Sequence, residues 1–224
     1  MKYYLYISQT KLEMIAQQIP EPLKQKYSGE FGINWWIVTA KASTEVETSS
    51  VSRTVDGVSE FIVQQKNPGS LQDAREWALD RMTVKHLTVK EDPNLFLLVG
   101  LKDGIYHCLG GSAHHVIGNR RGADADINYS YFPYMVGAIQ REFSEEGIAG
   151  RESREEFFGK EKVRSDFAGV KTHEWADAVR ALYEWSDAPT FEVAFLARQL
   201  AYGRSLHGDY CAVWSPLYIE LKST

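Results

Sequence analysis

The sequence has little cysteine, no long apolar run and no excess of positive charge. Its only cysteines, Cys108 and Cys211, show no metal-ligand spacing, which argues against a disulfide framework and against a zinc ribbon. No window approaches the roughly 18 apolar residues that a membrane-spanning helix needs. A net charge of -5 argues against binding of long nucleic acid through a basic surface. These absences predict a cytoplasmic protein and leave room for a small anionic ligand.

The chain is long enough to bury a core: it has 224 residues, of which 44% are hydrophobic. We expect one α/β (α+β) domain over residues 1–224, with a mixed β-sheet that contains a β-meander and is flanked by helices. A variable helical and loop region is expected at about 141–175, where charged residues of both signs predominate.

The N-terminal part predicts a strand, a tight turn and a helix. The strand is "KYYLYIS", and a capping-box spacing of Thr10 and Glu13 marks the start of a helix that ends at Pro20. "INWWIVTA", residues 33–40, is predicted as a second core strand parallel to the first. A polar stretch, 41–52, is then expected to be a loop, and a helix follows before "NPGS".

The pattern changes to short strands between Met82 and Val116. An Asp103-Gly104 pair between two apolar runs indicates a hairpin within an antiparallel meander. Later segments are expected to be mostly helical, and a last helix through Val193 and Leu200 stops at Gly203. The closing "YCAVWSPLYIEL" is predicted as a strand pair or as one bent strand.

"CLGGSAHHVIG", residues 108–118, is the strongest candidate for chemistry. Gly110 and Gly111 permit a close approach of the backbone to a ligand, and Ser112 adds a hydroxyl donor, so together they are expected to hold phosphate. His114 and His115 supply the side chain best suited to proton transfer near neutral pH. We therefore predict His114, His115 and Ser112 as catalytic residues.

Two other interpretations of this segment stay open. The glycines could form a bend whose histidines are merely hydrogen-bonded near the surface. A metal site could combine the same histidines with His107 or His86, but no His-x-His or His-Glu-x-x-His pattern supports it. We therefore expect no metal and no cofactor.

Two further segments are predicted to bind the ligand. "ISQTK" follows the first strand, where helix N-termini point free N–H groups at anions, so Ser8, Gln9, Thr10 and Lys11 are expected near a phosphate. It has no Gly-x-Gly-x-x-Gly pattern and no Walker lysine, which disfavours a dinucleotide or P-loop site. "NRRGADADINYSYFPY", residues 119–134, offers Arg120 for phosphate and Tyr129 and Tyr131 for stacking on bases.

Three stretches together resemble a little-characterised family of bacterial defence-associated proteins. They are "KYYLYISQTKLEMIAQQIP", "LGGSAHHVIG", and "FLARQLAYG" followed by "SPLYIEL". The family is similar to CRISPR-associated ring nucleases, which degrade cyclic oligoadenylate messengers. The resemblance covers both ends and the middle of the chain.

This resemblance implies a metal-independent phosphodiesterase, a ring nuclease of antiviral type III CRISPR signalling. Such an enzyme needs a base for a 2′-hydroxyl, an acid for the leaving 5′-oxygen and donors for the developing charge. A symmetric ring also suits a homodimer. The alternatives are a module that senses or sequesters the nucleotide without cleaving it, and an adaptor in a defence system.

Overall fold

A computed structural model describes residues 2–33, 35, 48–73, 75–88, 94–118 and 172–222. Its helices in these ranges are α1 (Gln9–Gln18), α2 (Glu21–Phe31), α4 (Thr48–Lys66) and α7 (Thr172–Glu184), with the 3-10 turn η1 (Ala113–His115). Its strands are β1 (Tyr3–Ile7), β2 (Trp77–Thr88), β3 (Leu95–Lys102), β4 (Ile105–Ser112), β5 (Thr190–Arg204) and β6 (Tyr210–Leu221).

Five of the strands close into a barrel. The sheet runs β1-β6-β4-β3-β2-β5, and a further pairing of β5 with β6 joins its two sides into the ring β2-β3-β4-β6-β5. Strands β4 and β6 are parallel, whereas the other pairs are antiparallel. A five-stranded barrel that begins with a meander and carries a helix before its last two strands has the architecture of the OB fold. Architecture alone specifies no ligand.

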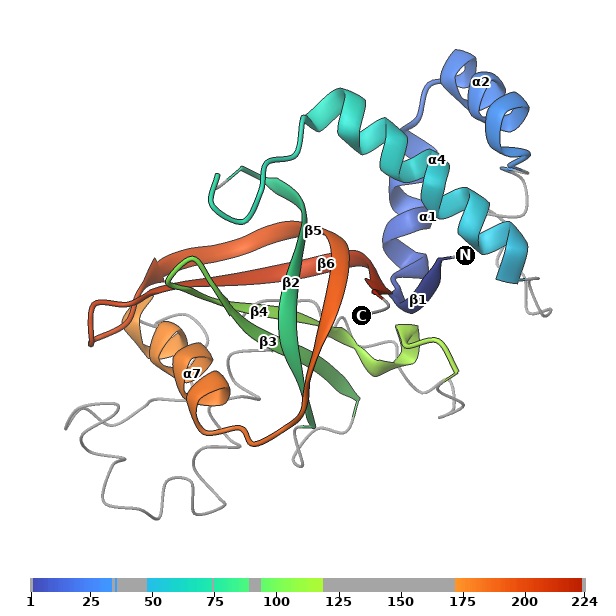
Figure 1. Ribbon diagram of the computed structural model, residues 1–224. Coiled ribbons are helices and arrows are strands. Elements are labelled where there is room, and N and C mark those ends of the chain that lie inside the picture. Colours follow the sequence, from blue (N-terminus) through green and yellow to red (C-terminus); the bar gives the residue numbers. More distant parts are fainter. Residues whose placement is uncertain are drawn as a thin grey trace.

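The barrel has two ends, which we name by what lies there (Figure 1). The hairpin end carries the β3–β4 turn at Asp103–Gly104 and the β5–β6 turn at 205–209. The β1 end carries the end of β4, the turn η1 and strand β1, which pairs with the last residues of β6. The parallel strands β4 and β6 both run from the hairpin end to the β1 end.

The barrel interior is one of three apolar clusters. Buried side chains from all five barrel strands meet there, and Trp214 and Phe195 are among the largest of them. Tyr6 from β1 enters the same cluster and stacks on Phe96 of β3, with ring centroids 5.4 Å apart. Strand β1 is therefore part of the core and fills the barrel at its own end.

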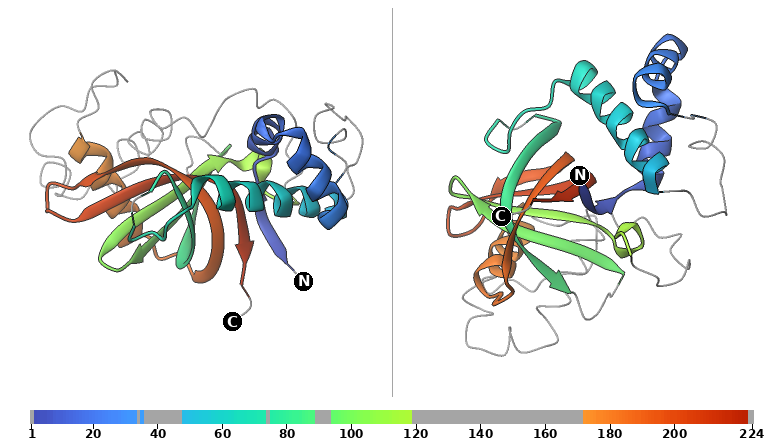
Figure 2. Two further views of the ribbon diagram at one scale, coloured as in Figure 1. Left: turned by 90° about the horizontal axis from the view of Figure 1, so that it is seen from above. Right: turned by 45° about the vertical axis from the view of Figure 1, so that its right-hand side comes forward.

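Helices cover the outside of the barrel on two sides (Figures 1 and 2). Helix α7 buries Trp175 and Val179 against the outer face of β3, β4 and β6, where Val99 and Cys108 lie. Helices α1, α2 and α4 form the other layer, which packs on the outer face of β5 and β6 near Leu196. The outer face of β3 and β4, which OB barrels use for oligonucleotides, is thus occupied by α7.

The structure confirms the α+β class with a mixed sheet, the strand-turn-helix start, and the meander with its Asp103-Gly104 turn. Both turn residues have positive φ, as a tight two-residue hairpin requires. The bent final strand is also confirmed, because β6 is continuous and its pairing with β5 shifts register beside Pro216.

Three local predictions are wrong. The predicted helix that stops at Gly203 is strand β5. Helix α4 begins at Thr48, inside the segment expected to be a loop. The first helix begins at Gln9 with Ser8 as its N-cap, so Thr10 does not cap it.

Other predictions fall outside the described residues. They include most of the variable region at 141–175 and residues 36–40 of the strand predicted over 33–40. The described part of that predicted strand is also wrong, because Ile33 is in no strand and Trp35 is helical. Within the described ranges, no helix combines the length and the apolarity needed to cross a membrane.

Candidate functional site

Two of the segments singled out in the sequence, about a hundred residues apart, meet at the β1 end of the barrel. Tyr6 of β1 forms an antiparallel bridge with Val116, and the N–H of Ile117 donates to the carbonyl of Leu5 at 2.9 Å. These bonds fasten the chain after the histidines to the strand that leads into α1. The ISQTK and GGSAHH segments therefore lie side by side.

The glycine pair does not form a loop. Gly110 and Gly111 lie inside β4, paired with Leu97 and Phe96, and neither has a positive φ. A Cβ on Gly111 would lie 2.2 Å from the Tyr6 hydroxyl oxygen and 2.8 Å from the ring carbon that carries it. The absence of a side chain at this position therefore lets Tyr6 enter the barrel. The phosphate cradle expected from these glycines is not formed.

Ser112 ends β4 and is buried, with 6% of its surface exposed. Its hydroxyl accepts the backbone N–H of His114 at 3.2 Å and caps the turn η1. A serine that caps a turn fixes the orientation of the residues that follow it. Ser112 is thus placed to position the histidines.

Lys11, in the first turn of α1, points its side chain toward β6. Its Nζ donates to Ser215 Oγ at 2.6 Å and to the carbonyl of Pro216 at 2.8 Å. Burial lowers the pKa of Lys11 to about 7, because neither partner carries a negative charge. The amine therefore changes its charge near neutral pH.

His115 is half-buried and lies at the same end of the barrel as this amine, whereas His114 is exposed. Burial, together with the smaller effects of the charges of His114 and Lys11, lowers the pKa of His115 to about 4. At neutral pH His115 is therefore uncharged.

A row of ring contacts continues from the histidines along the same end. The rings of His114 and His115 are 5.5 Å apart, and His115 meets the edge of Tyr6 at 5.7 Å. Beyond Tyr6, Phe96 lies 5.3 Å from the ring of His86, which is exposed on β2. Three of the six histidines of the chain thus gather at the β1 end.

The remaining residues of ISQTK have simpler positions. Ser8 is buried, and its N–H donates to the carbonyl of Leu217 at 2.8 Å. Gln9 and Thr10 are exposed in the first turn of α1, where a helix presents free N–H groups. They precede Lys11 in the same turn.

Sequence reasoning did not assign Tyr6 and Ser215 to the site, and considered His86 only as a metal ligand. Tyr6 lies in a segment whose sequence pattern is that of an ordinary core strand. Ser215 lies in a strand that is far in sequence from both the ISQTK and the GGSAHH segments. Among the described residues, no group of three or more His, Cys, Asp or Glu side chains is placed to hold a metal ion. The predicted ligand residues Arg120, Tyr129 and Tyr131 lie outside the described residues.

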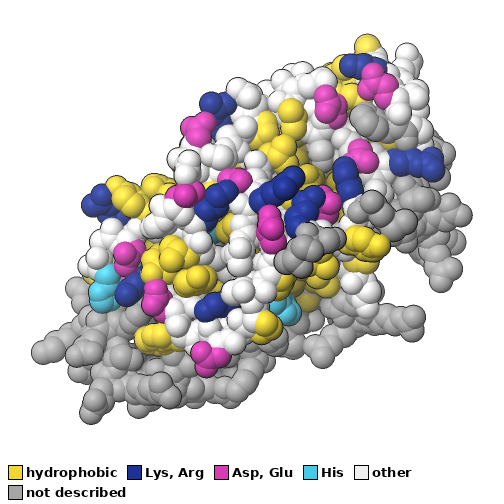
Figure 3. Space-filling view, viewed as in Figure 1, with side chains coloured by type: hydrophobic (Ala, Val, Ile, Leu, Met, Phe, Trp, Pro, Cys, Tyr) yellow, Lys and Arg dark blue, Asp and Glu magenta, His cyan; other side chains and the backbone are white. Residues whose placement is uncertain are grey.

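Charges on the described surface are mixed in sign. Figure 3 shows Lys and Arg side chains interspersed with Asp and Glu over the centre of the visible face. Several described ion pairs join charges of opposite sign, such as Lys2 with Asp56 at 2.5 Å and Arg198 with Glu76 at 3.1 Å. Such a face favours local binding of a small anion over a broad basic field.

Comparison with known proteins gives a family match for the sequence. The sequence model of a family of unknown function, DUF7019, matches residues 2–223. No curated protein matches the sequence, and no solved structure matches it. The relation to ring nucleases therefore stays a prediction.

Proposed function

The chain belongs to DUF7019, a family of unknown function, and we propose that it is a metal-independent phosphodiesterase that cleaves a small cyclic oligonucleotide at the β1 end. One arrangement supports the proposal: the Tyr6–Val116 bridge and the bond from the Ile117 N–H to the Leu5 carbonyl at 2.9 Å bring the segment of Lys11 and the segment of the histidines to one end of the barrel. Lys11 would bind the phosphate there, and His114 and His115 would supply two imidazoles.

The lowered pKa values of Lys11 and His115 are consistent with a binding site for an anion. Bringing the negative charge of a phosphodiester between Lys11 and His115 raises the pKa of both, because an opposite charge favours the protonated form. Lys11 then binds the phosphate as an ammonium. The N-terminus of α1, with Gln9 and Thr10, adds N–H groups that favour the same negative charge.

Cleavage proceeds by attack of a ribose 2′-hydroxyl oxygen on the adjacent phosphorus. The new O2′–P bond forms as the P–O5′ bond breaks, which leaves a 2′,3′-cyclic phosphate and a 5′-hydroxyl. His114 and His115 divide the proton transfers: one accepts the proton of the 2′-hydroxyl and the other donates a proton to the departing 5′-oxygen. Ser112 positions both by capping η1.

The resemblance described under Sequence analysis supports cyclic oligoadenylate as the ring. It also supports antiviral type III CRISPR signalling in the cytoplasm as the setting. A homodimer would present two copies of the site to one symmetric ring. We include these as parts of the proposal.

A sensor or sequestering module is the second candidate, and one observation favours it. A histidine whose pKa is near 4 is a weak base at neutral pH. If the anion does not restore its basicity, the same site would hold the ring without breaking it.

The test is incubation of the purified chain with cyclic tri-, tetra- and hexa-adenylate in EDTA, followed by chromatography. The proposal predicts linear products with 2′,3′-cyclic phosphate ends, and loss of cleavage in Lys11→Met and in at least one of His114→Ala and His115→Ala. Matched controls are Lys26→Met and His207→Ala, which alter exposed residues away from the site. Full activity in both histidine variants would exclude the assigned site, and an intact but bound ring would establish the sensor.

A further inference from the structure

The hairpin end carries an exposed stack of rings that the proposed function does not use. Tyr202 of β5 and Tyr210 of β6 stack with centroids 5.6 Å apart and an angle of 22° between the ring planes. The guanidinium carbon of Arg204 lies 4.3 Å from the centroid of the Tyr210 ring, and the same side chain donates to the Tyr210 hydroxyl. We call these three residues the tyrosine platform.

The platform is exposed although its residues are apolar in large part. Tyr202 retains 41% of its surface and Tyr210 retains 37%. Arg204 is also exposed, and within the described ranges no carboxylate forms an ion pair with it. More than a third of each tyrosine is therefore left accessible to a ligand.

Strand register explains why the three side chains share one face. Arg204 is paired with Tyr210 across the β5–β6 ladder, and Tyr202 is paired with Ala212 two residues along. Residues two apart on a strand point to the same side. Ala212 belongs to the interior cluster, so the platform extends the inner face of the barrel beyond its rim.

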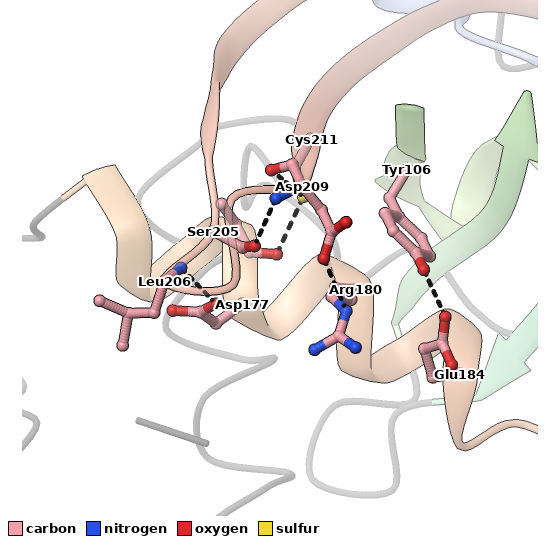
Figure 4. Close-up of polar contacts among 9 residues, drawn as sticks. Tyr106, Asp177, Arg180, Glu184, Ser205, Leu206, Asp209 and Cys211 are labelled. Atoms are coloured by element: carbon pink, nitrogen blue, oxygen red, sulfur yellow. Dashed lines mark hydrogen bonds and ion pairs between the residues drawn. The ribbon is translucent and has the colours of Figure 1, made fainter. Parts of the chain in front are cut away.

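The opposite face of the same hairpin is fastened to α7 (Figure 4). Buried Asp177 accepts the N–H of Leu206 at 2.9 Å, and Arg180 pairs with Asp209 at 3.0 Å. Within the turn, Ser205 Oγ accepts the N–H of Asp209 at 3.1 Å. None of these contacts involves the tyrosines, so the turn is held in place without them.

We propose that the tyrosine platform binds the unpaired bases of a single-stranded oligonucleotide. Base planes stack on tyrosine and on guanidinium planes with little dependence on sequence, and a guanidinium also pairs with the phosphate next to the base. The positive charge of Arg204 disfavours a cationic ligand and favours the polyanion. Because the turn is already ordered, binding costs little conformational entropy.

This site is independent of the phosphodiesterase proposal, since it lies at the other end of the barrel. The test is fluorescence anisotropy of a labelled linear oligoadenylate, titrated with the full chain. Tyr202→Ala should weaken binding about tenfold or more, the usual loss for removal of one stacking residue. Tyr202→Phe keeps the ring plane and should bind like the unchanged protein.

Tyr3→Ala is the control, because Tyr3 is an exposed tyrosine at the β1 end, with 59% of its surface open. Arg204→Gln should weaken binding and reduce its dependence on salt concentration. The proposal is overturned if the unchanged protein shows no saturable binding, if Tyr202→Ala binds as tightly as it does, or if Tyr3→Ala loses as much. A circular dichroism melt of each variant establishes that it is folded.

Discussion

At the β1 end of the barrel Lys11 and His115 are partly withdrawn from water, whereas at the hairpin end aromatic and cationic side chains stand on the surface. Lys11 and His115 are desolvated and held with their pKa values near 7 and 4. Tyr202 and Tyr210 are exposed and stacked. Desolvated groups of shifted pKa suit proton transfer, and rigid exposed planes suit binding.

The difference between the ends also lies in what supports them. Strand β1 closes its end by placing the Tyr6 ring against Gly111. On the hairpin side of the barrel, the strands β4 and β6 are joined by a buried polar pair, in which the indole N–H of Trp214 donates to His107 Nδ1 at 3.1 Å. Four predictions test this comparison, beginning with the largest expected effect.

His107→Ala should lower the free energy of unfolding by about 2–5 kcal/mol. His107 is fully buried, and its loss leaves a cavity and a buried indole N–H without its acceptor. Urea denaturation measures the effect. His207→Ala, at an exposed histidine, is the control and should change stability by no more than about 0.5 kcal/mol. Equal stability of the two variants would contradict a structural role for the His107–Trp214 pair.

Gly111→Ala should cost about 1–3 kcal/mol, because the added methyl group must displace the Tyr6 ring. Gly29→Ala is the matched control: it lies within α2, nothing is within 4 Å of its added Cβ, and a gain of roughly 0.5–1 kcal/mol is expected. Thermal denaturation gives both values. If Tyr6→Leu relieves part of the Gly111→Ala cost, the clash is with Tyr6; additive effects would locate it elsewhere.

Acid should destabilise both ends between about pH 6.5 and 4. Burial lowers the pKa of His107 to about 4, as it does for His115. In this window the unfolded chain, with ordinary histidine pKa values of roughly 6.5, binds more protons than the folded chain. The free energy of unfolding therefore falls as the pH falls. His107→Leu and His115→Gln should each flatten this slope in urea melts across the window, and an unchanged slope in both would refute the shifts.

Arg180→Gln should have the smallest effect, about 0.2–1 kcal/mol, because its ion pair with Asp209 is partly exposed to water. A double-mutant cycle with Asp209→Asn measures the coupling. A coupling well above this range would mean that the ion pair, and not Asp177, is the main anchor of the hairpin to α7.

The sequence pattern predicted strand β1 and the β3–β4 hairpin better than strand β5, and the reason is physical. "KYYLYIS" and the Asp103-Gly104 turn have local signals that tertiary packing does not alter. Strand β5 has no such signal. It is buried by the barrel interior on one face and by the helix layer at Leu196 on the other. The pairing of β5 with β6 also shifts register beside Leu196 and Gln199. Because both faces are buried and the register is interrupted, the apolar residues of β5 do not alternate, and their spacing resembles that of a helix.

The candidate site was predictable in part for the same reason. Lys11, His114 and His115 belong to motifs that stand out locally, and their meeting depended only on β1 lying beside the end of β4. Gly111 was predicted to approach a ligand. In the structure its lack of a side chain makes room for Tyr6, which lies over a hundred residues away in the sequence. The tyrosine platform could not be found, because it forms only when β5 and β6 pair as a hairpin.

The central claim is that Lys11 and His115 form one site for a phosphodiester anion. The most direct test is an NMR titration of the Lys11 side chain, assigned with Lys11→Arg, in the free protein and with a cyclic tetra-adenylate whose 2′-hydroxyls are removed to prevent cleavage. We predict a pKa of about 7 in the free protein and a higher value with the ring bound. An ordinary lysine pKa in the free protein, or a value that the bound ring leaves unchanged, would contradict the claim.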